Sequence, residues 1–167
     1  MERRLAEARH IVAQFDTPAE RLAGLLYSFL LYQAVDRGPD DVPAVLGLVT
    51  EAATWLAQRS SAQWQHPIEK LHRGIDRDTA RGEIWVVEDD AGTAIATITI
   101  TTTQTPSSGP RRPPRRRLYA RRMVVTRAHA GQEIASALLA WAAQRVSTAG
   151  KRWLRLDAWS GNAELRK

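Results

Sequence analysis

The stretch from Leu118 to Trp159 constrains the fold of this 167-residue chain more than any other part. Leu118–Val125 is β-prone, Gly131–Ala149 has apolar residues at helical spacing, and Trp153–Trp159 is β-prone again. A strand, a helix and a strand in this order form a right-handed crossover, which leaves the two strands parallel. The stretch therefore predicts a mixed sheet that contains a parallel pair.

A β-hairpin is predicted directly before this unit. Residues 83–88 and 93–102 are rich in β-branched residues, and the segment Asp89-Asp90-Ala91-Gly92 between them is typical of a hairpin turn. Residues 103–117 combine several prolines with Ser, Thr and Arg, which predicts a loop. The hairpin adds antiparallel strands to the same sheet.

The first half of the chain is predicted to be helical. Its segments with helical spacing or helix-start signals are 2–15, 16–35, 41–56, 67–71 and 76–80. Asp41 is expected to cap the third of these, with Pro43 in its first turn. The predicted fold class is α/β (α+β), a mixed central sheet flanked by helices. Residues 1–40 form an N-terminal helical extension, and residues 41–167 form one domain.

Composition excludes several kinds of site. The chain has no cysteine, which excludes disulfides, thiolate metal sites and cysteine nucleophiles, and its four histidines lack metal-ligand spacing. We expect no metal. The most apolar stretch, Leu22–Val35, is too short to span a membrane, and no signal-peptide pattern precedes it. We therefore expect a cytoplasmic protein without a membrane partner.

Positive charge is concentrated in residues 111–127. This segment contains eight arginines, Arg111 and Arg127 included, and no acidic residue. Two interpretations of the tract 111–122 stay open. It is a solvated loop, which we favour, or it neutralises the phosphates of a nucleic acid or of a phosphorylated ligand, or the charge of an acidic partner. Residues 111–117 contain no aromatic side chain for base stacking, so binding of a single strand gains no support and a nucleic-acid partner is not favoured.

A turn of small residues joins the strand that ends at Val125 to the following helix. It contains Gly131, Ala135 and Ser136. The first N–H groups of a helix have no partner within the helix and lie at the positive end of its dipole, so a pyrophosphate can bind there. The same pattern also occurs in ordinary strand–turn–helix connections, so it does not by itself identify a phosphate site.

Over residues 41–167 the chain resembles the GNAT superfamily of acetyl-CoA-dependent N-acetyltransferases. The family motif is Arg/Gln-x-x-Gly-x-Gly/Ala between the fourth strand and third helix, often followed by Ser-Ala-Leu-Leu. Here Ala130-Gly131-Gln132-Glu133-Ile134-Ala135 is followed by Ser136-Ala137-Leu138-Leu139, and Asn162 follows the next strand. Residues 83–99 resemble the family's second and third strands. Ala130 stands where Arg or Gln is usual, and Glu133 where glycine is usual.

The resemblance implies acetyl-CoA as co-substrate and a small-molecule or peptide amine as acceptor. The backbone of Met123, Val124 and Val125 would pair with the pantetheine arm as an added strand does. Asn162 would contact the pantetheine or the thiol end. The residues implied to hold the pyrophosphate are Ala130, Gly131, Gln132, Glu133, Ile134, Ala135 and Ser136.

Catalytic residues are not assigned by the resemblance. In many family members a tyrosine shortly after the asparagine protonates the leaving thiolate. Here Asn162-Ala163-Glu164-Leu165 begins that pattern and the sequence stops at Lys167. We therefore expect a domain that lacks this tyrosine and the final strands: either the chain is a truncation, or another chain completes it, or it no longer catalyses. Glu83 and Glu88 on a predicted central strand are weak candidates for the base, although a solvated strand end explains such residues equally well.

Other functions stay open beside N-acetyl transfer. One is a non-catalytic domain of this fold that binds CoA or a partner, and another is a nucleic-acid-binding module that uses residues 111–122. The apolar face of helices 2–35 needs cover from the domain or from a second copy, so a homodimer is a further expectation. Trp55, Trp64 and Trp85 are predicted to pack in the core or to line a pocket.

Overall fold

The computed structural model describes residues 38–59, 63–64, 67–89, 91–103 and 117–156, and all structural statements below concern these residues. Several predicted features lie outside the described residues: the helices within residues 2–35, the arginines from 111 to 116, and Asn162. The predicted N-terminal extension therefore stays a prediction.

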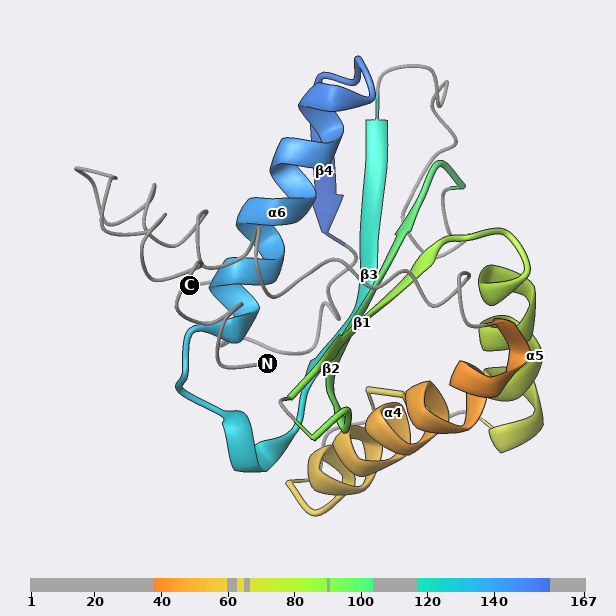
Figure 1. Cartoon of the computed structure of the whole chain (residues 1–167). Helices are drawn as coiled ribbons and strands as arrows, with labels where there is room; N and C mark the ends of the chain where they lie inside the picture. Colours follow the sequence, from red (N-terminus) through yellow and green to blue (C-terminus); the bar gives the residue numbers. More distant parts are fainter. Residues whose placement is uncertain (1–37, 60–62, 65–66, 90, 104–116, 157–167) are drawn as a thin grey trace.

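The described strands form one mixed sheet in the order β1-β2-β3-β4 (Figure 1). The strands are β1 (Ile84–Glu88), β2 (Ala94–Thr101), β3 (Arg117–Val125) and β4 (Trp153–Leu156). β1 pairs with β2, and β2 with β3, in antiparallel orientation, whereas β3 and β4 are parallel. The parallel pair predicted from the crossover is confirmed. The carboxylate of Asp89 accepts hydrogen bonds from the N–H groups of Ala91 and Thr93, which closes the predicted hairpin turn.

Helices cover both faces of this sheet. α6 (Ile134–Thr148) lies on one face, and α4 (Val42–Ala57) and α5 (Ile68–Thr79) lie on the other (Figure 1). On the α6 face, Trp85 and Trp141 meet edge to face, with ring centroids 4.7 Å apart. The α4 and α5 face has its own core, built around Val49, Ile75 and other buried aliphatic residues.

Two helix predictions differ from the structure. Residues 68–79 form a single helix, α5, rather than two short pieces. Its Gly74 lies against the guanidinium of Arg122, since a Cβ added at that glycine would stand 3.2 Å from Nη1 of the arginine. The second difference concerns α6, which begins at Ile134 instead of Gly131. The backbone ahead of it turns twice into the left-handed region.

A bulge interrupts β3 in its middle. Thr97 pairs with Val124 and Thr99 with Arg121, so Ile98 alone faces the two residues between them. One of these, Arg122, has φ +48, a left-handed conformation. Side chains alternate between the faces of a regular strand, but here Arg121 and Arg122 both reach the α5 side. The bulge thus places two consecutive cations on one face.

Candidate functional site

The connection between β3 and α6 is a compact turn with two left-handed residues. It begins with the single 3-10 turn η4 (Arg127–His129), and the hydroxyl of Thr126 lies 2.9 Å from Nδ1 of His129. Further on, Gly131 has φ +80 and Glu133 has φ +59. Glu133 occupies the N-cap position of α6. The chain therefore reverses direction sharply just before the helix starts.

The first turn of α6 has backbone N–H groups that can donate hydrogen bonds to an anion. The N–H groups of Ile134, Ala135 and Ser136 stand ahead of the first helical hydrogen bonds, and the Glu133 side chain makes no capping hydrogen bond. Gly131 and Ser136 are exposed. The site thus combines free donors, the positive end of a helix dipole and access from solvent.

The second half of β3 leads directly into this turn. Val124 is buried on the α4 face, whereas Met123 and Val125 pack against the core under α6. The pairing of β3 with β4 runs from Arg117↔Trp153 to Ala120↔Leu156, before the bulge is reached. Backbone from Met123 to Val125 is therefore bonded to β2 on one side and lies beyond the described pairing on the other.

A buried ion cluster lies beneath the bulge, and the sequence did not predict it. Asp78 at the end of α5 is 0% exposed, and its Oδ2 accepts hydrogen bonds from Arg121, at 2.8 Å, and from Arg122. Its Oδ1 accepts a hydrogen bond of 3.1 Å from Nε of Arg77. Arg122 also lies 3.3 Å from the hydroxyl of Thr99. A carboxylate in the C-terminal turn of an amphipathic helix normally indicates a solvated position, so no local signal pointed to this contact.

The cluster sets the electrostatics of the bulge. Burial lowers the pKa of the Arg122 guanidinium below its ordinary value, although the charge of Asp78 raises it in return. Side-chain exposures of 10% for Arg121 and 16% for Arg122 show that both cations are largely removed from water. The interpretation of the tract 111–122 as a solvated loop is therefore wrong for these two residues. Together with Arg117, they belong to β3.

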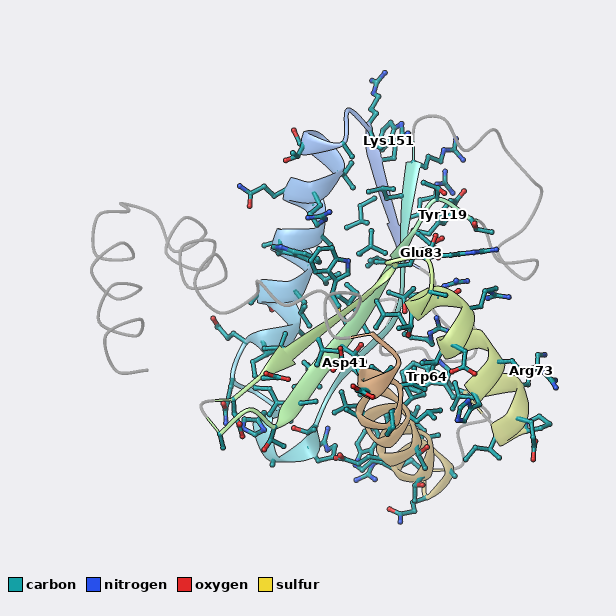
Figure 2. The ribbon with its side chains drawn as sticks, turned by 45° about the vertical axis from the view of Figure 1, so that its right-hand side comes forward. Asp41, Trp64, Arg73, Glu83, Tyr119 and Lys151 are labelled. Atoms are coloured by element: carbon teal, nitrogen blue, oxygen red, sulfur yellow. The ribbon has the colours of Figure 1, made fainter. Side chains whose placement is uncertain are left out.

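The two candidate glutamates lie at opposite ends of β1, with Glu83 just before it and Glu88 as its last residue. Glu83 precedes it and accepts a hydrogen bond of 2.8 Å from the hydroxyl of Thr101, close to Tyr119 on β3 (Figure 2). Its other oxygen, Oε2, is buried without a hydrogen-bond partner in the described structure. Glu88 pairs with Ala94 at the end of the sheet where the turn after β3 lies. The structure does not bring the two carboxylates together.

The three predicted tryptophans lie in different surroundings. Trp85 is buried in the core under α6, and Trp64 packs on the core at the α4 and α5 side (Figure 2). Trp55 is only half-buried and contacts two guanidinium groups. Those of Arg59 and Arg127 stand 4.0 and 4.4 Å from its ring centre. Trp55 therefore contacts the turn after β3 instead of filling the core.

The described residues offer neither a metal site nor a membrane span. They contain no group of three or more His, Cys, Asp or Glu side chains that could hold a metal ion. None of the helices among them is long and apolar enough to cross a membrane.

Comparison with protein families identifies the class to which this arrangement belongs. Residues 49–166 match the model of the acetyltransferase (GNAT) family, which covers more than half of the chain. The chain therefore belongs to the GNAT acetyltransferase family. A comparison with curated proteins found no match.

Solved structures agree on the fold. A GNAT-family acetyltransferase from Listeria monocytogenes 4b F2365 has a TM-score of 0.64 and 23% identity, over 77% of each chain. A GCN5-related N-acetyltransferase from Ralstonia eutropha JMP134 has a TM-score of 0.55 and 23% identity, over 76% of this chain and 83% of its own. A predicted acetyltransferase from Clostridium acetobutylicum, solved with acetyl-CoA, has a TM-score of 0.52 and 15% identity, over 75% and 80%. The sheet with flanking helices is thus the GNAT fold.

Proposed function

We propose that this protein is an acetyl-CoA-dependent N-acetyltransferase that transfers an acetyl group to an amine. The observation that carries the proposal is the turn after β3, where two left-handed residues expose the first N–H groups of α6 in a chain of this family. These donors suit a pyrophosphate. The solved relative from Clostridium acetobutylicum, which holds acetyl-CoA, supports this choice of ligand.

The proposed ligand has a defined direction along β3. With the pyrophosphate at the turn Ala130–Ser136, the pantetheine arm runs back along the backbone of Met123–Val125 as an added strand. The thioester then lies toward Arg121 and the bulge. Asn162, outside the described residues, is proposed by family resemblance to contact the pantetheine or the thiol end.

This direction separates the two base candidates. Ile84 on β1 pairs with Thr99 on β2, which pairs with Arg121 on β3, so Glu83, next to Ile84, lies at the level of the proposed thioester. Glu88 lies at the other end of β1, level with the proposed pyrophosphate. Glu83 is therefore the better candidate to accept, directly or through water, the proton that the attacking ammonium must lose. The neutral amine attacks the acetyl carbonyl, the C–S bond breaks, and the thiolate of CoA takes up a proton.

Isothermal titration with acetyl-CoA, together with release of free CoA thiol in the presence of a panel of amines, tests the proposal. We expect binding in the micromolar range and thiol release that depends on the amine. Binding without release would support the non-catalytic alternative. Absence of heat at high micromolar acetyl-CoA would contradict the cofactor assignment.

A nucleic-acid module built on residues 111–122 gains no support from the described arginines. Arg121 and Arg122 are engaged by Asp78 and largely buried. Binding to DNA or RNA with a steep salt dependence would nevertheless favour that function over acetyl transfer.

A further inference from the structure

Helix α4 holds the turn after β3 at two points. The backbone N–H of Arg127 donates a hydrogen bond of 2.9 Å to Oε1 of Glu51 on α4. The guanidinium of the same arginine lies over the ring of Trp55, 4.4 Å from its centre. Glu51 and Trp55 are four residues apart and so lie on one face of the helix. Backbone and side chain of Arg127 are therefore both fixed by α4.

Arg59 is a second cation in contact with Trp55. Its guanidinium stands 4.0 Å from the centre of the Trp55 ring, and its Nη1 lies 3.5 Å from the carbonyl oxygen of Trp55. An indole that contacts two cations is restricted in its rotamers, and each contact adds attraction through the ring quadrupole. The ring is thereby held in place for Arg127.

The contact with α4 lies between two other points at which the turn is attached to the rest of the domain. Before it, the N–H of Thr126 donates to the carbonyl of Ile95, which fixes the turn to β2. After it, Ile134 packs against the core under α6. Between these points the side chains of Arg127 and Ala128 are exposed. The α4 contact is the tertiary restraint that the described structure shows at Arg127.

We propose that Glu51 and Trp55 are positioning residues for the pyrophosphate of CoA, acting through Arg127 on the turn Ala130–Ser136. This inference rests on the proposed function. Glu133 holds left-handed backbone, which costs free energy in a residue other than glycine and persists only where the surrounding structure enforces it. A turn already fixed before the ligand arrives loses less entropy on binding, so the contact with α4 raises affinity without touching the ligand.

The test uses the full chain with alanine and conservative variants. Glu51→Ala removes the acceptor, whereas Glu51→Gln keeps an oxygen that the Arg127 N–H can reach. Trp55→Leu removes the ring and Trp55→Phe keeps an aromatic face. Glu69→Ala, an exposed glutamate in the first turn of α5, is the matched control. Calorimetry measures binding of CoA, dephospho-CoA and S-acetylpantetheine, which has no pyrophosphate.

We expect the double variant Glu51→Ala/Trp55→Leu to bind CoA and dephospho-CoA about threefold to tenfold more weakly, a loss of the size that exposed hydrogen-bond and cation–π contacts support. S-acetylpantetheine should bind equally well to all variants. The double variant Glu51→Gln/Trp55→Phe should recover most of the affinity for CoA and dephospho-CoA. Hydrogen exchange of amides 127–136 in the free protein should accelerate in the double variant and stay unchanged in Glu69→Ala.

Several results would overturn the inference. Unchanged CoA affinity in the double variant is one, and an equal loss for S-acetylpantetheine, which indicates a general structural defect, is another. A loss for CoA but not for dephospho-CoA would mean that Arg127 or Arg59 binds the 3′-phosphate directly. If the unmodified protein binds none of the three ligands, the proposed function fails as well. The exchange measurement then reports separately whether α4 restrains the turn.

Discussion

Glu133 shows why a glycine is usual at its position in related sequences. Its φ of +59 lies in the left-handed region, where a side chain costs roughly 1–2 kcal/mol and glycine costs none. The carboxylate also stands at the N-terminus of α6. There it suits the helix dipole in the free protein, but it would repel the pyrophosphate that we propose for this turn.

Two variants separate these effects. Glu133→Gln removes the charge and keeps the backbone cost, and we expect acetyl-CoA to bind about twofold to fivefold more tightly, as expected for one exposed like-charge contact. Glu133→Gly also releases the strain and should bind at least as tightly. Its stability should change by less than about 1 kcal/mol, because relief of strain is offset by greater freedom of the unfolded chain. Calorimetry and thermal unfolding measure both, and weaker binding of Glu133→Gln would contradict the assignment of this turn.

Asp78 is the residue whose loss should cost the most. Asp78→Asn leaves Arg121 and Arg122 buried without their counter-charge, and removing one partner of a buried ion pair costs about 3–5 kcal/mol. Urea unfolding measures the change. Asp76→Asn, in the same helix, breaks only an exposed pair with His72 and should cost less than about 1 kcal/mol. Similar losses for both variants would show that the buried cluster contributes no particular stability.

At the scale of the elements, the packing of Arg122 against α5 explains the glycine in the middle of that helix. Its Gly74 weakens the helix by about 1 kcal/mol relative to alanine, but it leaves room for the Arg122 guanidinium that Asp78 holds. Gly47 in α4 faces open space, with no atom within 4 Å of an added Cβ. The two helical glycines therefore offer a matched comparison.

We expect Gly47→Ala to stabilise the protein by about 0.5–1 kcal/mol through helix propensity alone. Gly74→Ala should gain nothing or lose stability, because its Cβ would stand 3.2 Å from Nη1 of an arginine that cannot move freely. Chemical denaturation of the two variants measures the difference. An equal gain in both would mean that Arg122 rearranges without cost.

Strands and helices with clear periodicity were predictable, because local spacing alone defines them. The hairpin, the crossover helix and the parallel pair follow from such spacing, and the structure confirms them. The bulge at Arg122 was not predictable, since Leu118–Val125 shows no break in its β-prone composition. It depends on Asp78, which is 44 residues away in sequence.

The same limit applies to the candidate site. Small residues indicated where the chain turns into α6, but not the left-handed backbone of Glu133. The support from α4 joins residues 76 positions apart, and neither Glu51 nor Trp55 differs locally from ordinary helix residues. Contacts of this range are properties of the packed structure and leave no periodic signal in the sequence.

At the scale of the whole molecule, one sheet joins two separate cores. Leu138 of α6 is buried against one face of the sheet and Leu48 of α4 against the other. β1, β2 and β3 contribute residues to both clusters. Since the strands are shared, neither core can be lost while the other stays intact. The two cores should therefore unfold together.

We expect Leu48→Ala and Leu138→Ala each to lower the free energy of unfolding by about 2–5 kcal/mol. Each should shift one common transition, with the same midpoint by tryptophan fluorescence and by far-UV circular dichroism. Ala143→Ser, at an exposed position of α6, is the control. Two separate transitions in either leucine variant would show that the faces fold independently.

The order of the sheet, β1-β2-β3-β4, is also the order of the chain. Every described strand therefore pairs with the one synthesised just before it, and none must wait for a partner far downstream. The β1–β2 connection, residues 89–93, is short, whereas the β2–β3 connection spans residues 102–116 and the β3–α6–β4 crossover spans residues 126–152. The loop-closure entropy therefore grows from one step to the next. During translation each described strand can pair with its predecessor as it leaves the ribosome, and we expect the docking of β4 through α6 to be the slowest of these steps.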